Sequence, residues 1–281
     1  MKTQRPQDLV FSLFGEYLLD RPGPVWVGSL IEMLAPFELS SGAARTVLSR
    51  MSRKGWLRAE RIGRHGFYEL SLRGRRLLEE GSRRIHDPPR DEAWDGTWVL
   101  VTYTVPEELR SARDGLRDRL LWLGCGSLGN GLWISPHDIV EPVRAAADEL
   151  GIGDRVEAFR AEHAGFSDTA RLVAQCWDLS AIQRRYERFI RTTNPLYLDA
   201  LAAARRGDLG PETAFVRRFR LIHEYREFPL VDPYLPRALL PKEWPGECAA
   251  WLFEHYRELL SEPADHHVDQ VLVTAQDAVP A

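Results

Sequence analysis

Cysteine is scarce in this chain of 281 residues, and long apolar runs are missing. Its three cysteines, Cys125, Cys176 and Cys248, are odd in number and far apart, which argues against a disulfide framework and against a spaced zinc site. No stretch approaches the roughly 18 apolar residues that a membrane span requires. The first residues contain no apolar signal core. We therefore expect a protein of the reducing cytoplasm that has no membrane partner.

The composition is that of a globular protein, with 44% hydrophobic and 28% charged residues. Such a balance excludes a wholly disordered or fibrous chain, and the length allows two or three domains. The net charge of −4 is unevenly distributed. Residues 1–86 contain 15 basic and 9 acidic residues, a net charge of +6, so the remainder carries −10. A basic block on an acidic body indicates a module that binds a polyanion, although a solvated arginine-rich surface has the same composition.

The N-terminal block has the pattern of a winged helix-turn-helix, which we place at residues 1–86. Helical spacing at 8–19, a second helix near 30–35 and a third from Ser40 or Ser41 to Lys54 precede two short strands, 56–62 and 67–70. Gly55 is suited to end the third helix, and a fourth helix is expected at 71–84. A polar segment rich in proline, 87–92, is typical of a linker.

Two further domains are expected after the linker, so the predicted fold class is α+β. Residues 93–175 alternate strands and helices in the order βαββαβ, which is the order of a ferredoxin-like sheet. Residues 176–262 are mainly helical, with Asn194-Pro195 separating the first two helices and a last helix ending near Leu260. Residues 263–281 show no clear packing pattern, and we expect a flexible tail.

The third helix has the sharpest chemical pattern in the sequence. At 100° per residue, an apolar stripe forms on one side, and the opposite side is small at its start and cationic at its end. A helix that lies in the major groove of DNA needs such a face, because short donors allow close approach and arginine binds guanine or phosphate. The tip of the predicted wing adds two more basic residues. The predicted DNA-binding residues are Arg45, Thr46, Ser49, Arg50, Arg53, Arg64 and His65.

Several separate motifs, in order along residues 8–260, resemble the PaaX-type repressors of phenylacetic acid degradation. They include 12–17 (SLFGEY), 44–51 (ARTVLSRM), 94–98 (WDGTW), 221–226 (LIHEYR) and 239–246 (LLPKEWPG). The resemblance implies a homodimeric, sequence-specific transcriptional repressor that binds palindromic double-stranded DNA operators. It further implies release by an aromatic acyl-CoA such as phenylacetyl-CoA, and control of an aromatic-acid catabolic pathway.

An effector site is expected in the helical C-terminal domain, where aromatic side chains and arginines occur together. The candidate effector-binding residues are His223, Tyr225, Arg226, Asp232 and Trp244. His223 and Glu227 are one helical turn apart, but the second histidine of an H-E-x-x-H zinc motif is missing. We favour a structural hydrogen-bond network around His223 over a metal site, and whether the pair binds a metal stays open.

The alternative function is a DNA-targeted enzyme, a nuclease or hydrolase that uses the middle or C-terminal domain. Asp95 opens the predicted ferredoxin-like sheet, where some nucleases of that fold place a carboxylate, but it has no partner of this kind in the sequence. No nucleophile–base pair, metal cluster or phosphate-binding glycine loop stands at usable spacing. The sequence therefore favours a regulator that is not an enzyme and needs no cofactor.

Overall fold

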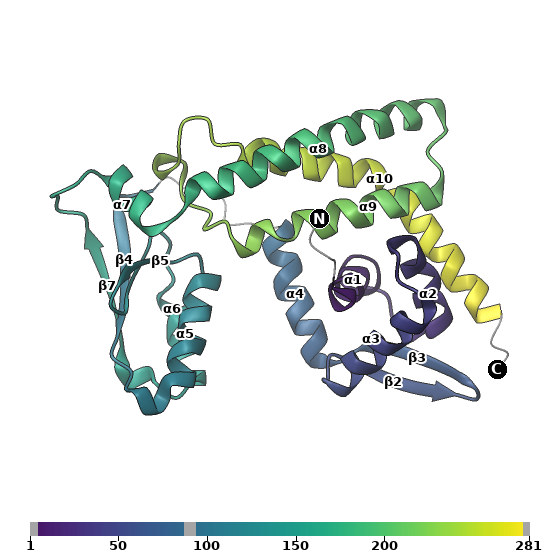
Figure 1. Cartoon of the computed structure of the whole chain (residues 1–281), viewed down its shortest axis with the longest axis horizontal. Helices are drawn as coiled ribbons and strands as arrows, with labels where there is room; N and C mark the ends of the chain where they lie inside the picture. Colours follow the sequence, from purple (N-terminus) through teal and green to yellow (C-terminus); the bar gives the residue numbers. More distant parts are fainter. Residues whose placement is uncertain (1–4, 87–93, 278–281) are drawn as a thin grey trace. The chain divides into compact units, whose positions relative to one another are not determined.

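The computed structural model describes residues 5–86 and 94–277, so the predicted linker at 87–92 lies outside the described residues. The chain divides into two compact units (Figure 1). The first unit combines Met1–Asp87, Phe189–Glu227 and Cys248–Ala281, and the second combines Pro88–Arg188 and Phe228–Glu247. Both α-helices and small antiparallel sheets occur, and the C-terminal part is helical. The N-terminal segment therefore belongs to one compact unit with helices that are more than 100 residues away in the sequence.

The N-terminal segment contains four α-helices and one small sheet of order β1-β3-β2. Its elements are α1 (Pro6–Leu13), a π-helical turn (Phe14–Leu18), β1 (Val25–Trp26), α2 (Val27–Leu34), α3 (Ser41–Arg53), β2 (Leu57–Ile62), β3 (His65–Leu70) and α4 (Leu72–His86). The β2–β3 hairpin pairs Leu57 with Leu70 at one end and Ile62 with His65 at the other. All of the helices and strands predicted for this segment are present, with ends that differ by a few residues.

Both ends of α3 are set by local chemistry. The Ser40 hydroxyl accepts a hydrogen bond from the Ala43 backbone N–H at 3.3 Å, which identifies Ser40 rather than Ser41 as the N-cap. Gly55 follows the helix with a φ of +73°, a conformation that glycine adopts without steric cost. The helix therefore begins and ends where the sequence predicts.

The C-terminal helices differ from the prediction in two places. The helix α8 (Leu179–Arg206) continues through Pro195, and α10 (Gly246–Asp277) continues well past Leu260. The predicted flexible tail from residue 263 is therefore wrong as far as Asp277, and residues 278–281 lie outside the described part. The physical reason is that Ala264, Val268 and Val271 repeat at helical spacing and are buried.

The helix α9 (Pro211–Tyr225) lies between these two in sequence and belongs to the first unit. Its N-terminal proline stands at a position that tolerates the missing N–H. The aromatic rings of Phe215 and Phe219 on α9 pack against the N-terminal segment, and Phe219 stacks on Phe37 with ring centroids 3.9 Å apart. The N-terminal helices and α9 therefore share one core.

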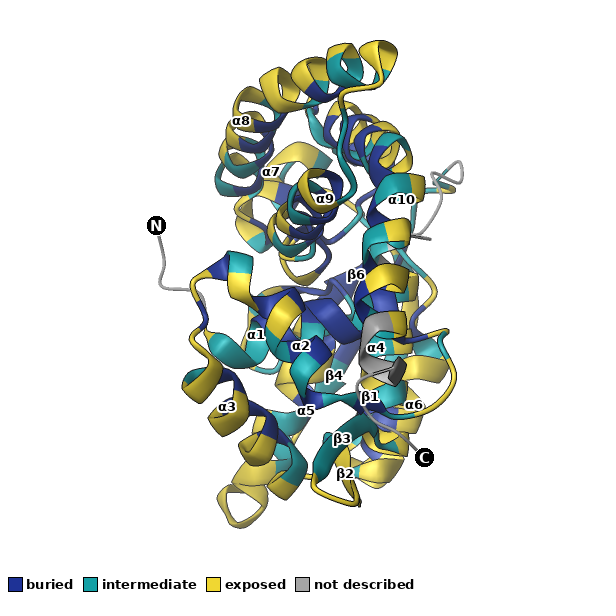
Figure 2. Cartoon of the chain, turned by 90° about the vertical axis from the view of Figure 1, so that its right-hand side faces the viewer, coloured by how far each residue is buried: buried dark blue, intermediate teal, exposed yellow. Residues whose placement is uncertain are grey.

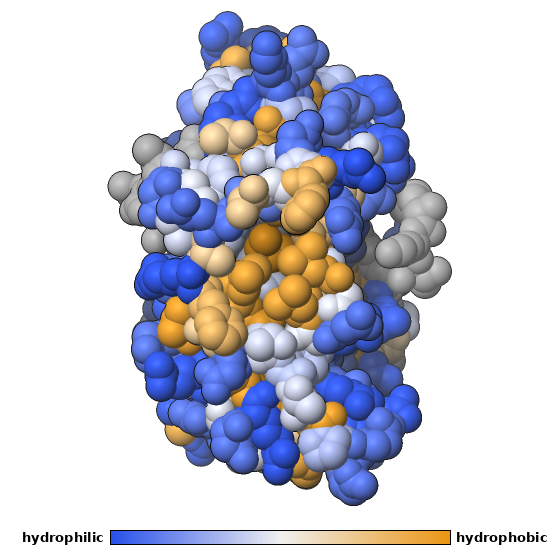
Figure 3. Space-filling view, turned by 90° about the vertical axis from the view of Figure 1, so that its left-hand side faces the viewer, coloured by the Kyte–Doolittle hydropathy of each residue, from blue (hydrophilic) through white to orange (hydrophobic). Residues whose placement is uncertain are grey.

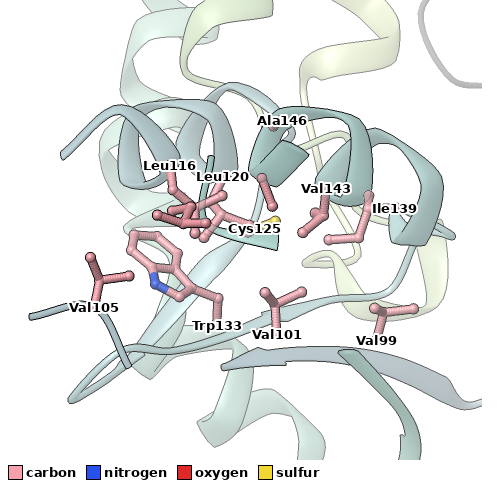
Figure 4. Packing of buried hydrophobic residues seen from close by; sticks show 12 residues of the cluster. Val99, Val101, Val105, Leu116, Leu120, Cys125, Trp133, Ile139, Val143 and Ala146 are labelled. Carbon is pink, nitrogen blue, oxygen red and sulfur yellow. The ribbon is translucent and has the colours of Figure 1, made fainter. Parts of the chain in front are cut away.

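The second unit is built around a four-stranded antiparallel sheet of order β5-β6-β4-β7. Its elements are β4 (Thr97–Tyr103), α5 (Arg110–Trp122), β5 (Gly126–Gly129), β6 (Leu132–Ser135), α6 (Val140–Glu149) and β7 (Val156–Glu162). Figure 4 shows side chains of α5 and α6 meeting those of the sheet, with Trp133 and Val101 facing Leu116, Leu120 and Val143. The two helices therefore cover one face of the sheet.

A helix that the sequence analysis did not predict, α7 (Thr169–Cys176), packs on part of the other face. There it contacts β5 so closely that a Cβ atom on Gly126 would stand 2.5 Å from the Cys176 Cβ. Trp98 is 1% exposed beneath this cover and belongs to one buried cluster with Trp177, Leu235 and Leu239. Glycine at position 126 thus permits the approach of α7 to the sheet.

In the part of the chain that the structure describes, no helix combines the length and the apolar character that crossing a membrane requires.

Candidate nucleic-acid interface

The helix α3 separates its apolar and polar residues cleanly. Ala44, Val47, Leu48 and Met51 are at most 2% exposed and form the predicted inner stripe. The opposite side of the helix is exposed, and Figure 2 shows both exposed and buried residues along α3. We call this side the α3 outer face, and its predicted DNA-binding residues are Arg45, Thr46, Ser49, Arg50 and Arg53, all of them exposed.

The cationic groups of the α3 outer face are electrostatically available. Within residues 5–86 and 94–277, no carboxylate lies within ion-pair distance of Arg45, Arg50 or Arg53. By contrast, Arg58 on β2 stands 3.4 Å from the Glu69 carboxylate. Unpaired guanidinium groups on an exposed helix can bind phosphate or the edge of a base without first giving up an internal partner.

Thr46 and Ser49 add short polar groups to the same face. The Thr46 hydroxyl donates to the Gly42 carbonyl at 2.9 Å, so its oxygen keeps acceptor capacity toward solvent. Gly42 itself is exposed, with open space around its Cα atom. The first turn of α3 therefore carries short side chains, which allow it to approach a groove of DNA closely.

The tip of the β2–β3 hairpin places the two predicted wing residues side by side. Arg64 is exposed, and its Nε–H donates to His65 Nε2 at 3.3 Å. His65 is half-buried and packs edge-on to the Trp26 indole, with centroids 5.9 Å apart. Gly63 has a φ of +57°, which the tight turn requires. Arg64 is thus the freer of the two wing residues, while His65 also helps to hold the hairpin on β1.

The five candidate effector residues are divided between the two compact units. His223, Tyr225 and Arg226 belong to the first unit, whereas Asp232 and Trp244 belong to the second. Each group is described by its own contacts.

His223 and Arg226 connect the end of α9 to α1. A hydrogen bond of 2.9 Å joins His223 Nδ1 and Ser12 Oγ. The Arg226 guanidinium donates to Ser12 Oγ at 2.9 Å and to the Asp8 carbonyl at 3.1 Å. Burial and the nearby Arg226 charge lower the pKa of His223 to about 4, so the imidazole is neutral at pH 7. The hydrogen-bond network expected around His223 is confirmed.

No group of three or more metal-ligating side chains occurs among the described residues, so His223 and Glu227 gain no third ligand there. Tyr225 is 7% exposed and stacks on Phe253 of α10 at 3.9 Å between centroids. This ring forms part of the interior of the first unit.

In the second unit, Asp232 and Trp244 both contact Tyr186. The Tyr186 hydroxyl donates to Asp232 Oδ2 at 2.6 Å, and the Trp244 ring meets the Tyr186 ring edge-on at 5.9 Å. Tyr186 also stacks on Phe228 with centroids 4.2 Å apart. Asp232 and Trp244 are 5% and 8% exposed, so both are packed inside the second unit.

Sequence reasoning missed the buried charges of the first unit. Glu16 in the π-helical turn and Arg218 in α9 have side chains that are each 5% exposed and lie 2.7 Å apart. Arg257 of α10 donates to the same Glu16 carboxylate at 3.2 Å, and Asp265 stands 2.9 Å from Arg218. Burial raises the pKa of Glu16, and the two guanidinium groups oppose that rise. The sequence contains one sign of this burial: at helical spacing, both residues fall on the apolar side of their helices.

A surface cavity of about 560 Å³ was also missed, because it lies beside the unpredicted helix α7. It belongs to the second unit and is lined by Val173, Trp177, Leu239 and Leu240 together with the polar Gln175. The lining within the described part of the chain includes no arginine or lysine. This cavity has room for a small apolar group, but its lining lacks the cationic groups that bind phosphates.

Comparison with known proteins shows which family this arrangement represents. Three family models match in chain order: a PaaX-like protein over residues 5–74, the PaaX protein central Cas2-like domain over 91–173, and the PaaX-like protein C-terminal domain over 177–270. The chain is similar to the transcriptional repressor PaaX of Escherichia coli (strain K12), with 35% identity over 277 residues, which cover 97% of this chain and 86% of that protein. The chain therefore belongs to the PaaX family.

A solved structure also resembles this fold. An uncharacterized protein, Rv0674 from Mycobacterium tuberculosis, superposes with a TM-score of 0.59 at 24% sequence identity. The match covers 95% of this chain and 98% of that one. The likeness concerns the fold along nearly the whole chain.

Proposed function

We propose that this protein is a sequence-specific DNA-binding transcriptional repressor that is not an enzyme and acts in the cytoplasm. The observation that carries the proposal is the α3 outer face, where Arg45, Arg50 and Arg53 are exposed without an ion-pair partner in the described chain. The relative in Escherichia coli bears the name of a transcriptional repressor, which supports the same function.

The proposal includes three finer assignments of fold. The order of three helices followed by the β2–β3 hairpin supports a winged helix-turn-helix at residues 1–86. The strand order β5-β6-β4-β7, with helices after β4 and β6, supports a ferredoxin-like domain at residues 93–175. Residues 176–262 form the helical C-terminal domain of this division, to which the remainder of α10 is now added.

We assign DNA contact to Arg45, Thr46, Ser49, Arg50 and Arg53 on α3 and to Arg64 and His65 on the wing. A single winged helix reads few base pairs, so specificity for one operator favours a homodimer on a palindromic site. Half-sites spaced by whole helical turns, about 10–10.5 base pairs, would place two α3 helices in successive major grooves on one side of the duplex.

The effector in this proposal is an aromatic acyl-CoA such as phenylacetyl-CoA, which links the protein to aromatic-acid catabolism. Release requires the ligand to bind the DNA-incompetent arrangement more tightly than the competent one. His223 and Arg226 bind Ser12 and Asp8 of α1, and α1 packs on α3. A ligand that takes over the hydrogen bonds of Arg226 would therefore loosen the support of α3.

Gel retardation with duplex DNA in the presence of Mg²⁺ tests the central proposal. Genomic fragments that the protein selects serve as operator. Retarded and intact DNA supports the repressor, whereas strand cleavage supports the alternative of a DNA-targeted nuclease or hydrolase. Failure to retard any duplex at low salt contradicts the proposal.

Titration of phenylacetyl-CoA against the preformed complex tests the effector assignment. Arg226→Ala removes the same hydrogen bonds permanently, so it is expected to weaken DNA binding and to lose any further response to the ligand. Arg220→Ala, an exposed arginine on the same helix, is expected to behave as wild type. Unchanged release by Arg226→Ala removes this residue from the effector site. No release of the wild type by any aromatic acyl-CoA removes the effector class.

A further inference from the structure

The start of α4 lies directly against the end of α3, within the first unit. The Ser71 hydroxyl donates to the Gly55 carbonyl at 2.7 Å, and the Ser71 backbone N–H donates to the Trp56 carbonyl at 3.1 Å. The first turn of α4 approaches so closely that a Cβ atom on Gly74 would stand 2.2 Å from the Trp56 carbonyl oxygen. Figure 1 shows the lower end of α4 beside α3 and the β2–β3 hairpin. The start of α4 is therefore a neighbour of the helix that carries the α3 outer face.

Arg73, in this first turn of α4, has its guanidinium held by an aromatic ring. The central carbon of the guanidinium lies over the Trp56 ring, 4.0 Å from its centroid. Trp56 is half-buried, and Phe11 of α1 meets its ring edge-on at 5.8 Å between centroids. A guanidinium that stacks on a ring still directs its N–H donors outward in its own plane. Trp56 therefore fixes one face of Arg73 and leaves the donors of Arg73 available.

The charge of Arg73 is not used inside the described chain. Among the described residues, no carboxylate stands within ion-pair distance of its guanidinium, whereas the neighbouring Arg75 stands 3.8 Å from the Glu79 carboxylate. The Leu72 side chain is 78% exposed, so the described chain does not cover this turn. Cations are unfavourable near a helix N-terminus, so α4 itself gains no stability from the charge of Arg73.

The exposed surface of the second unit has a different character. Figure 3 views the molecule from the side on which β4 and β7 lie in Figure 1, and shows apolar side chains gathered near the middle of that view. Exposed cations of this unit are paired: Arg160 stands 2.8 Å from Asp138, and Arg113 stands 3.0 Å from Glu107. Arg73 therefore resembles the arginines of the α3 outer face rather than these paired arginines.

We propose that Arg73 is a further DNA-binding residue, which donates to a phosphate of the strand next to the end of α3. The inference rests on the proposed function, because it takes α3 as the helix that enters the major groove. That groove is about 12 Å wide and has phosphates on both sides, so the end of a helix that lies in it comes close to a backbone.

Trp56 is a positioning residue in this arrangement. Its ring already restricts the rotamers of Arg73, which reduces the entropy that the side chain loses when it binds a phosphate. The contact fixes the orientation of α3 in the groove and carries no sequence information of its own.

Fluorescence anisotropy with the selected operator and with scrambled duplex tests the contact. Arg73→Ala is expected to weaken binding to both duplexes by the same factor, and to reduce the slope of log K against log salt by about 0.9. Arg83→Ala is the matched control, because Arg83 is an exposed arginine about 15 Å farther along the same helix, and it is expected to behave as wild type. Far-UV circular dichroism and thermal unfolding verify that both variants are folded.

Replacing the ring gives a readout that a purely structural role of Trp56 would not change. Trp56→Leu is expected to weaken DNA binding in the wild-type background and to have a much smaller effect when Arg73 is already alanine. Trp56→Phe keeps an aromatic face under the guanidinium and is expected to retain most of the wild-type affinity. Equal effects of Trp56→Leu in the two backgrounds overturn the claim that the ring orders Arg73 for DNA.

Comparison with Arg45→Ala on α3 separates this inference from the proposed function. If Arg45→Ala weakens binding while Arg73→Ala keeps the slope and affinity of wild type, the contact of Arg73 fails and the function stands. If Arg73→Ala weakens binding to the operator alone, the assignment of a phosphate contact is overturned. A wild type that binds no duplex at low salt overturns the proposed function, and the contact of Arg73 with it.

Discussion

The arginines of α3 and those of α9 show how one residue type serves opposite purposes in this molecule. Arg45, Arg50 and Arg53 on α3 are exposed and have no ion-pair partner in the described chain. Arg218 on α9 is 5% exposed between Glu16 and Asp265. Leaving the three arginines of α3 in water costs little free energy, and they are available to bind a polyanion. Arg218 holds a buried carboxylate of the N-terminal segment against the C-terminal helices.

The buried contacts of Arg218 help to join the N-terminal segment and the C-terminal helices into one compact unit. Glu16 lies in the π-helical turn that follows α1, and it accepts from arginines of both α9 and α10. Such π-helical turns are rare and are frequent at functional sites. The Arg218 guanidinium also lies over the Tyr17 ring, 5.1 Å from its centroid. Arg218 and Arg257 therefore join α9 and α10 to the turn that follows α1, and α1 packs on α3.

The largest effect is expected from removing Arg218. Arg218→Ala leaves Glu16 buried without one of its two guanidinium partners, so the free energy of unfolding should fall by about 3–5 kcal/mol. Urea unfolding measures this change. Arg206→Ala is the control, because Arg206 pairs with Asp208 at 2.7 Å with both side chains about 60% exposed, and its removal should cost at most about 1 kcal/mol. Equal decreases in the free energy of unfolding of the two variants would show that the buried ion pair contributes no more to stability than the exposed one.

His223 is expected to make stability depend on pH. Its pKa is about 4 in the folded protein, below its ordinary value of 6.5, so the unfolded chain binds more protons between these values. Stability is therefore full above pH 6.5 and decreases as the pH falls toward 4. At pH 5 this group alone should lower the free energy of unfolding by about 2 kcal/mol. His223→Gln should flatten the profile of urea midpoints over that range, and a profile identical to wild type would contradict the shift.

On the α3 outer face, Arg45→Ala is expected to weaken binding to a selected operator by about 1–3 kcal/mol and to relax the sequence preference at one position. Its folding stability should change by less than about 0.5 kcal/mol, since Arg45 is exposed. Fluorescence anisotropy with operator and with scrambled duplex measures both effects on binding. An equal decrease on both duplexes would make Arg45 a phosphate contact rather than a base contact.

The smallest of these effects is expected for Arg53→Ala, near the end of α3. Removing a phosphate contact there would weaken binding to all duplexes alike, so the ratio between operator and scrambled DNA should stay at the wild-type value. Arg205→Ala on α8, an exposed arginine far along the chain, controls for the removal of one positive charge. If Arg53→Ala and Arg205→Ala have the same affinity as wild type, Arg53 does not contact DNA.

The sequence alone predicts those features that depend on near neighbours in the chain. The inner stripe of α3, the Ser40 cap and the Gly55 terminus follow from spacing within 16 residues, and the structure confirms them. The strands of the second unit were likewise predicted, because their apolar runs are bounded by turn residues.

Features that depend on distant contacts could not be predicted. Glu16 and Arg218 are separated by about 200 positions, and only the folded chain shows that they meet. For the same reason the sequence does not show which rings Tyr225 and Trp244 meet: Tyr225 stacks on Phe253, and Trp244 meets Tyr186 edge-on. The helix α8 continues through Pro195, and Phe189 and Ala200 on either side of the proline are buried, which is tertiary context that local propensity does not contain.

The salt dependence of DNA binding tests the central claim most directly. Removing one arginine that binds a phosphate should reduce the slope of log K against log salt by about 0.9. We predict that replacing Arg45, Arg50 and Arg53 together by alanine reduces the slope by about 1–3 and keeps the unfolding midpoint at the wild-type value. A control variant in which two other exposed arginines, Arg205 and Arg220, are replaced by alanine should keep the wild-type slope. A triple variant with the slope and affinity of wild type would contradict the assignment of α3 as the helix that binds DNA.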